Sequence, residues 1–217
     1  MLKWARENGC EWNYYICNYA SCNGHLEVLK WALENGCKID YLSYDRIAKG
    51  GHLNVLKWFQ ENDYKMEIDI CRIAAEYGYL DMLIWARENN YKWSYSTCKY
   101  AAYNNHMDVL KWARENGCEW DSSVCTFAAE NGNLNVLKWA QKNGCNWDSF
   151  TCSNAAKNGH LDVLKWAREN GCKWDSKTCS DAAKNRHLNI LQWAKNKVVY
   201  NKNCKTYSNT MWKICPE

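Results

Sequence analysis

The sequence predicts an all-α protein, built as a stack of short helix pairs that repeat every 27 residues. Three observations predict this fold: an evenly spaced tryptophan, a leucine two residues before it, and an almost complete lack of proline. The single proline, Pro216, lies next to the end of the 217-residue chain, so helices can run uninterrupted. A fixed period of this length is typical of solenoid proteins.

The recurring tryptophan marks one fixed position in each repeat unit. Alanine follows it except at Phe59, and Ala-Ala pairs recur between the later tryptophans, beginning at Ala74, Ala101, Ala128, Ala155 and Ala182. The tryptophans at this position are Trp4, Trp31, Trp58, Trp85, Trp112, Trp139, Trp166 and Trp193. Such equal intervals indicate identical building blocks rather than chance.

Two helices can be recognised in each unit, and the seventh unit shows them well. The first helix is expected from about Phe150 to Asn158, with Asp148 or Ser149 placed to cap it. The second is expected from about Leu161 to Asn170. Each is followed by a glycine, which suits the left-handed turn past a helix end.

The short helices predict that neighbouring units stabilise each other. Isolated helices below roughly 12–15 residues are marginal in water, so a single unit would not fold alone. Stacking buries the apolar faces in one continuous core, and each tryptophan can bury on the order of 200 Å² between units. The expected buried face of one second helix is Leu161, Val163, Leu164, Trp166 and Ala167.

One stretch resembles the ankyrin repeat: Ala-Ala-Lys-Asn-Gly-His-Leu-Asp-Val-Leu-Lys-Trp-Ala-Arg-Glu-Asn-Gly-Cys (155–172). Ankyrin units also contain paired alanines, then Gly-His, an aliphatic helix and Gly-Ala. The strings Leu-Lys-Trp-Ala and Gly-Cys-x-Trp-Asp are similar to the short, Trp- and Cys-rich arrays of large DNA viruses of amoebae. The resemblance implies a non-enzymatic module that binds a partner protein, with a host protein as the partner in the viral case.

The unit departs from the family in its length. The usual ankyrin repeat has about 33 residues, and the deficit here falls between Asp175 and Thr178 and at equivalent places. In the family this stretch forms a projecting β-hairpin. We therefore expect an ankyrin-like helical-repeat solenoid with shortened or missing β-hairpins, in which recognition falls on the concave face of the first helices.

The two ends of the expected single array, residues 1–217, differ from the middle. Met1 begins inside a second helix, which makes the first repeat truncated, and residues from about 195 to 217 form a degenerate C-terminal cap. Residues 1–181 hold 21 basic and 23 acidic residues (21 − 23 = −2), whereas residues 182–217 hold 7 and 1 (7 − 1 = +6). A nucleic-acid-binding body is therefore unlikely, and the basic end leaves a contact with RNA or an acidic protein as an alternative.

The positions that vary between units are candidates for partner recognition. Near the middle of the array they carry aromatic and cationic side chains, the types that anchor protein interfaces. The candidate partner-binding residues are Arg72, Ile73, Tyr77, Tyr100, Tyr103 and Phe127. Two alternatives stay open: these side chains pack on neighbouring repeats, or the chain is a decayed paralogue without a specific partner.

Eleven of the fourteen cysteines occupy two repeat positions, one in the first helix and one after the second. Cysteines seven residues apart are not lost together, as Cys37 faces Tyr44 and Tyr91 faces Cys98. The pattern favours small buried thiols over zinc ligands or disulfides, and hence a reducing, cytoplasmic compartment, the host cytoplasm if the protein is viral. The histidines His25, His52, His106, His160 and His187 share one repeat position and are expected to bond loop backbone.

Nothing in the sequence indicates catalysis. It contains no glycine-rich phosphate loop, catalytic-triad string or His-Glu-x-x-His motif, so we expect no enzyme, no cofactor, no metal and no small-molecule substrate. No run of 18 apolar residues occurs, which argues against a membrane partner.

Overall fold

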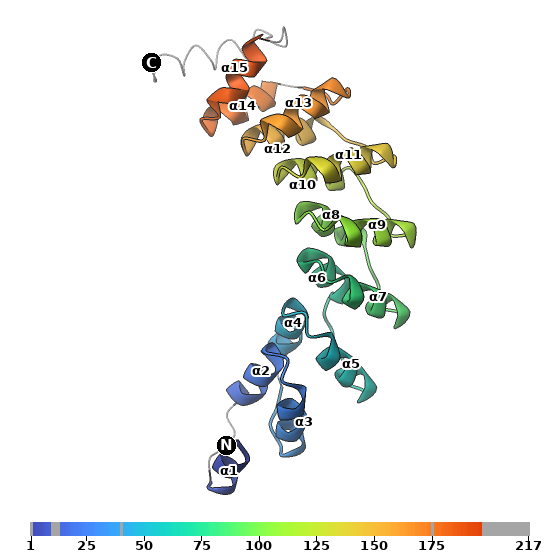
Figure 1. Cartoon of the computed structure of the whole chain (residues 1–217), viewed down its shortest axis with the longest axis vertical. Helices are drawn as coiled ribbons and strands as arrows, with labels where there is room; N and C mark the ends of the chain where they lie inside the picture. Colours follow the sequence, from blue (N-terminus) through green and yellow to red (C-terminus); the bar gives the residue numbers. More distant parts are fainter. Residues whose placement is uncertain (1, 10–13, 40, 175, 197–217) are drawn as a thin grey trace. The chain divides into compact units, whose positions relative to one another are not determined.

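A computed structural model describes residues 2–9, 14–39, 41–174 and 176–196, and every regular element in these ranges is an α-helix (Figure 1). The structure divides into two compact units, Met1–Trp93 and Ser94–Glu217. The helices of the first unit are α1 (Leu2–Glu7), α2 (Tyr14–Cys22), α3 (Leu26–Glu34), α4 (Tyr41–Lys49), α5 (Leu53–Glu61), α6 (Ile70–Tyr77) and α7 (Leu80–Glu88). Those of the second are α8 (Tyr95–Tyr103), α9 (Met107–Glu115), α10 (Ser123–Glu130), α11 (Leu134–Lys142), α12 (Ser149–Lys157), α13 (Leu161–Glu169), α14 (Ser176–Lys184) and α15 (Leu188–Asn196).

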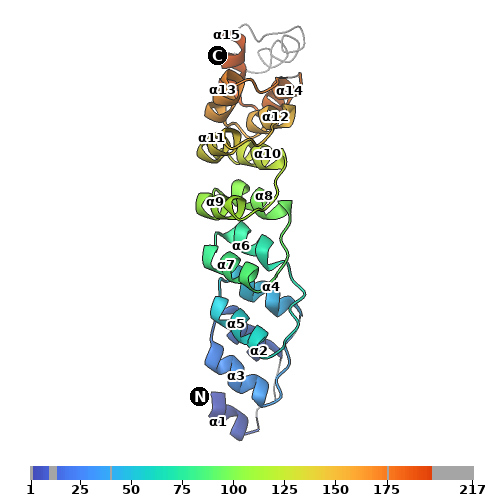
Figure 2. The same ribbon diagram turned by 90° about the vertical axis from the view of Figure 1, so that its right-hand side faces the viewer.

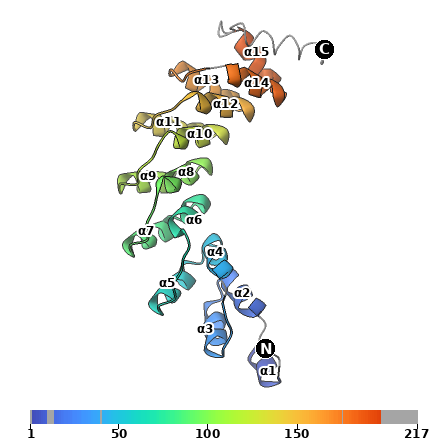
Figure 3. The same cartoon turned by 180° about the vertical axis from the view of Figure 1, so that it is seen from behind.

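The helices come in pairs, and the pairs stack within each unit. Each first helix packs on the second helix that follows it, from α2 with α3 through α14 with α15. First helices also pack on one another, α2 on α4 on α6 in one unit and α8 on α10 on α12 on α14 in the other. In the second unit they form one layer, and the second helices form the other (Figures 2 and 3).

The expected absence of projecting hairpins is confirmed for the described residues, which contain helices and turns but no strand. A connection such as 116–122 leads directly from a second helix to the next first helix. The predicted all-α, ankyrin-like solenoid architecture is therefore correct, whereas the single array over 1–217 stays a prediction. The expected cap at 195–217 lies outside the described residues, except for the end of α15.

Local sequence signals explain where the helices begin and end. The side chain of Asp148 accepts a hydrogen bond from the backbone N–H of Phe150 at 2.9 Å, so it caps α12 as expected. Gly159 and Gly171 follow α12 and α13 with φ of +83° and +88°, the left-handed region that favours glycine. The predicted helix ends were correct to within a residue.

The core follows the repeat. The leucine before each tryptophan is buried at Leu29, Leu56, Leu83, Leu110, Leu137, Leu164 and Leu191. In the predicted apolar face of α13, Val163, Leu164 and Ala167 are buried, while Leu161 and Trp166 are half-buried. Trp4 differs from the later tryptophans, because 66% of its surface is exposed at the start of the described chain.

The tryptophans join neighbouring repeats of the second unit, as expected. Trp139, Trp166 and Trp193 each pair with a second tryptophan that follows the preceding second helix, and their ring centroids lie 5.5–5.7 Å apart. Two of these three pairs are edge-to-face, a favourable geometry for aromatic rings, and the third is tilted. The pairs are Trp120–Trp139, Trp147–Trp166 and Trp174–Trp193.

The recurring histidine also joins one repeat to the one before it. Nε2 of His160 lies 3.0 Å from the carbonyl oxygen of Glu130, at the end of the preceding first helix. His52 and His187 make the same contact at 2.8 and 2.9 Å, to the carbonyl oxygens of Cys22 and Lys157. The expected backbone bond is therefore confirmed for these three histidines, and it extends between repeats.

Two other residue types take the place of this histidine and keep the contact. The hydroxyl of Tyr79 donates to the carbonyl oxygen of Lys49 at 3.0 Å. Asn133 Nδ2 donates to the carbonyl oxygens of Ala102 and Tyr103 at 2.9 and 2.7 Å. The stack thus requires a donor of suitable reach at this position, not imidazole chemistry.

Removing the donor is expected to weaken the stack. We expect His160→Ala to lower the free energy of unfolding by about 1 kcal/mol or more, because a buried carbonyl loses its partner. His160→Asn should stay close to wild type, since Asn133 makes the equivalent bond. Urea denaturation measures both, and an alanine variant as stable as wild type would contradict the role of this bond.

The glycine before the histidine provides the second expectation. A Cβ at Gly159 would lie 2.7 Å from Cε1 of His187, whereas a Cβ at Gly171 would meet nothing within 4 Å. Both positions have positive φ, so alanine at either costs about 1–2 kcal/mol. Gly159→Ala should therefore be the more destabilising variant in thermal unfolding, and equal melting temperatures would count against the close ring packing.

Candidate functional site

Four side chains form a cluster on the first helices of the second unit. Lys99, Tyr100 and Tyr103 come from α8, and Phe127 comes from α10. The rings of Tyr103 and Phe127 meet edge-to-face, with centroids 5.7 Å apart. The ammonium group of Lys99 lies 4.3 Å from the centre of the Phe127 ring and 5.2 Å from that of Tyr100. We call this set the α8–α10 cluster.

The cluster is half-buried, so its rings pack on each other and still present surface to solvent. Its backbone is held in place by the next repeat. The carbonyl oxygen of Tyr103 accepts hydrogen bonds from the side chains of Asn131 and Asn133, both at 2.7 Å. These bonds fix the end of α8 against the neighbouring repeat, and they position Tyr103 beside Phe127.

The other three predicted residues lie on α6 of the first unit. Ile73 is fully buried, so its place among the surface candidates was wrong. It packs into the core because an isoleucine on this helix gains more from burial than from exposure. Arg72 forms an ion pair with Glu76 at 2.5 Å, and Tyr77, 41% exposed, stacks on Tyr79 with centroids 6.0 Å apart.

Sequence reasoning missed two features of the first-helix layer. Lys99 was not among the candidates, and its contact with Phe127 depends on the packing of α8 against α10. Lys177 lies 4.8 Å from the ring centre of Phe150, an exposed aromatic residue at the start of α12. A search for cations and aromatic residues 27 residues apart would have found this second pair.

The prediction of free thiols needs correction, because Cys17, Cys37 and Cys179 are disulfide-bonded. In the first unit Cys17 and Cys37 are joined by a disulfide, whereas Cys71, Cys98, Cys118, Cys125, Cys145, Cys152 and Cys172 are buried thiols. The linked residues are 20 apart in sequence, not seven. Residues with this separation meet because the chain returns past its own first helix after completing the second.

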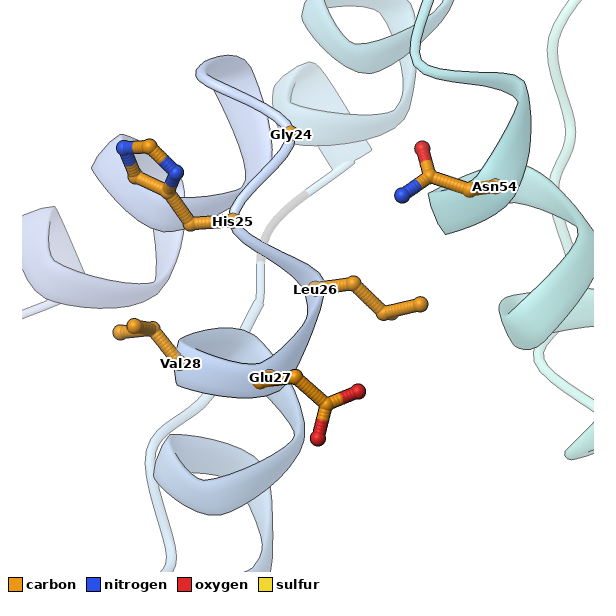
Figure 4. A pocket seen from close by; sticks show the side chains of 6 residues that line it. All are labelled: Gly24, His25, Leu26, Glu27, Val28 and Asn54. Atoms are coloured by element: carbon orange, nitrogen blue, oxygen red, sulfur yellow. The ribbon is translucent and has the colours of Figure 1, made fainter.

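The described residues offer little for small ligands or metals. They contain no group of three or more His, Cys, Asp or Glu side chains that could hold a metal ion. Figure 4 shows an open hollow at the start of α3, where Leu26 and Glu27 point toward the side of Asn54. His25 also lines the hollow, and the carboxylate of Glu27 pairs with Lys30 at 3.0 Å.

Within the described part of the chain, none of the helices has the length and apolar character that a bilayer crossing requires.

The stacked helix pairs and the varied surface of the first helices define a helical-repeat scaffold. Residues 98–141 match the family model described as ankyrin repeats (many copies). The crystal structure of the human ASB11 ankyrin repeat domain is similar in fold, with a TM-score of 0.58 and 16% sequence identity over 72% of this chain and 84% of that chain. No curated protein sequence matches the chain.

Residues 98–141 are therefore similar in sequence to ankyrin repeats, and the chain has the fold of an ankyrin repeat domain, as the sequence resemblance predicted. Ankyrin repeats are generally protein–protein interaction modules, and the fold is typically a non-enzymatic scaffold.

A double-mutant cycle tests how far the cluster supports the stack. We expect Tyr103→Ala and Phe127→Ala to be coupled by about 0.5–1.5 kcal/mol, the usual strength of an edge-to-face pair. Urea denaturation of the two single variants and the double variant gives this coupling. The control combines Tyr103→Ala with Lys138→Ala, an exposed residue of α11, and should be additive. No coupling in the first cycle would show that the two rings act independently.

Proposed function

We propose that the protein binds a partner protein through the first-helix layer of its second unit, with the α8–α10 cluster at the centre of the contact. The observation that supports this most is the cluster itself. Two tyrosines, a phenylalanine and a lysine gather at positions that vary between repeats, beside scaffold positions that recur. Tyrosine and phenylalanine supply large contact area with little loss of side-chain freedom.

The geometry suggests what the partner presents. The rings offer an apolar surface, and Lys99 adds a positive charge directly beside it. A partner with an apolar anchor side chain and a neighbouring carboxylate would complement both features. In the first unit we include Arg72, which is paired with Glu76, and the exposed Tyr77 in the proposal as a second contact; we leave out the buried Ile73.

The resemblance to viral arrays favours a host protein as the partner, met in the cytoplasm. Two rival functions predict different behaviour. A decayed paralogue would fold without recovering any specific partner. A nucleic-acid contact through residues 182–217 would weaken steeply with salt, because binding to phosphates releases counterions.

Substitution of the cluster is expected to abolish partner binding. In Tyr100→Ser/Tyr103→Ser/Phe127→Ser the apolar anchors are lost, while the buried leucine and alanine positions are unchanged. We expect at least a tenfold loss of affinity, because anchor residues commonly contribute about 2 kcal/mol or more. Partners recovered from host lysate with immobilised wild-type protein would be measured against this variant, with circular dichroism confirming that both are folded.

The matched control changes exposed residues of the second helices instead. Lys111→Ala/Lys138→Ala alters α9 and α11 in the same repeats and should retain the partner. A partner that binds the serine variant as well as wild type would rule out the cluster. A partner lost with the control variant instead would place the contact on the second helices.

A further inference from the structure

The buried cysteines of the second unit form pairs that the proposed binding surface does not use. Each pair joins a cysteine of a first helix to the cysteine 20 residues later, after the second helix of the same repeat. The two thiol groups of each pair lie close enough to shift each other's pKa, the thiol of Cys125 donates to the carbonyl oxygen of Cys145 at 3.9 Å, and all six side chains are buried. The pairs are Cys98–Cys118, Cys125–Cys145 and Cys152–Cys172.

The equivalent pair in the first unit is already bonded. Cys17 of α2 and Cys37 after α3 are joined as a disulfide, with a Cα–Cα distance of 6.5 Å. This distance lies within the range of roughly 4.4–6.8 Å that disulfides span. The repeat backbone therefore places the two positions where an S–S bond can form.

Two repeats have other residues at one or both of these positions. In the second repeat both are tyrosines, Tyr44 and Tyr64, and each packs on Phe59 with ring centroids 5.2 and 5.0 Å apart. In the third repeat Cys71 remains, its thiol donates to the backbone carbonyl of Tyr91 at 3.8 Å, and Tyr91 occupies the later position. The two positions are thus replaced together in the second repeat, whereas in the third repeat only the later cysteine is replaced.

The two members of a pair differ in acidity. The hydrogen bond from Cys125 lowers the pKa of Cys145, and the bond to Cys145 raises the pKa of Cys125. The hydrogen bond from Cys152 likewise lowers the pKa of Cys172. In these two pairs the cysteine after the second helix is therefore the one favoured as a thiolate, the form that attacks oxidants.

We propose that the three cysteine pairs are redox-modification sites, which a hydroperoxide oxidises to disulfides within each repeat. The thiolate after the second helix attacks one oxygen of the peroxide, the O–O bond breaks, and the departing oxygen leaves as water after taking up a proton. The resulting sulfenic acid is attacked by the first-helix thiol. The S–O bond breaks as the S–S bond forms, and the hydroxide takes the proton of that thiol. Two thiols are oxidised, and one hydrogen peroxide is reduced to two waters.

Each bond would tie a first helix to the segment that follows its second helix. The link closes a loop around one helix pair, which restricts the unfolded chain and stabilises the repeat. Because α8 and α10 carry Cys98 and Cys125 as well as the α8–α10 cluster, oxidation would stabilise the same repeats. The proposal does not depend on the identity of any partner.

Peptide mapping of the full chain tests the pairing. Fully reduced protein is treated with hydrogen peroxide, its remaining thiols are alkylated, and it is digested with trypsin and an Asp-specific protease. Asp121 separates Cys118 from Cys125, and Asp148 separates Cys145 from Cys152, so the two possible pairings give different peptides. We expect linked peptides for the three pairs, each lacking two hydrogen atoms, while Cys71 is not linked to any of the six.

Two outcomes would overturn the proposal. The first is linkage between cysteines seven residues apart, or random linkage. The second is complete alkylation of the six thiols at a peroxide dose that modifies the more accessible Cys22.

Thermal unfolding gives an independent measurement. Oxidation should raise the melting temperature of the wild-type chain by several degrees more than that of Cys118→Ser/Cys145→Ser/Cys172→Ser, which keeps Cys17 and Cys37. An equal change in the two proteins would show that the three pairs do not respond to peroxide.

Discussion

The contact between neighbouring repeats is the constraint on which this structure depends. Its helices are six to nine residues long, too short to be stable alone in water. In several repeats a side chain reaches the last carbonyl groups of the preceding first helix, as His160 reaches Glu130 and Asn133 reaches Tyr103. The ring of His160 also leaves no room for a Cβ on Gly132, the glycine that follows the preceding first helix. Hydrogen bonding, packing and backbone conformation therefore act together at one junction.

Only some positions of each first helix make these stacking contacts, so the remaining positions can vary between repeats. Leucine, alanine and tryptophan positions make the core and the lateral contacts, so substitutions there must be compensated. The second repeat shows such compensation, because Phe59 replaces an alanine where Tyr44 and Tyr64 replace two cysteines. Lys99, Tyr100 and Phe127 occupy positions that do not form the core. The same helices can therefore carry both the stacking contacts and the proposed recognition surface.

The cysteines show that spacing along the chain alone can indicate the wrong spatial partner for a repeated residue. Seven residues separate a cysteine after one second helix from the cysteine of the next first helix. That short separation suggested that the two are partners, but in several repeats only one of them is a cysteine. The spatial partner lies 20 residues away within the same repeat, because the second helix returns the chain to its own first helix. Tested on the correct partner, the same criterion of joint replacement holds for Tyr44 and Tyr64.

By itself, the sequence determined the helix pairs, their boundaries, the missing hairpins and the bond-forming histidines, because these follow from local capping, helical periodicity and a strict repeat. The α8–α10 cluster was predicted in its aromatic members for the same reason. The burial of Ile73, the position of Lys99 over Phe127 and the pairing of the thiols were decided only by the tertiary structure. Each of these depends on how far one helix rotates against its neighbour, and a linear pattern does not specify that rotation.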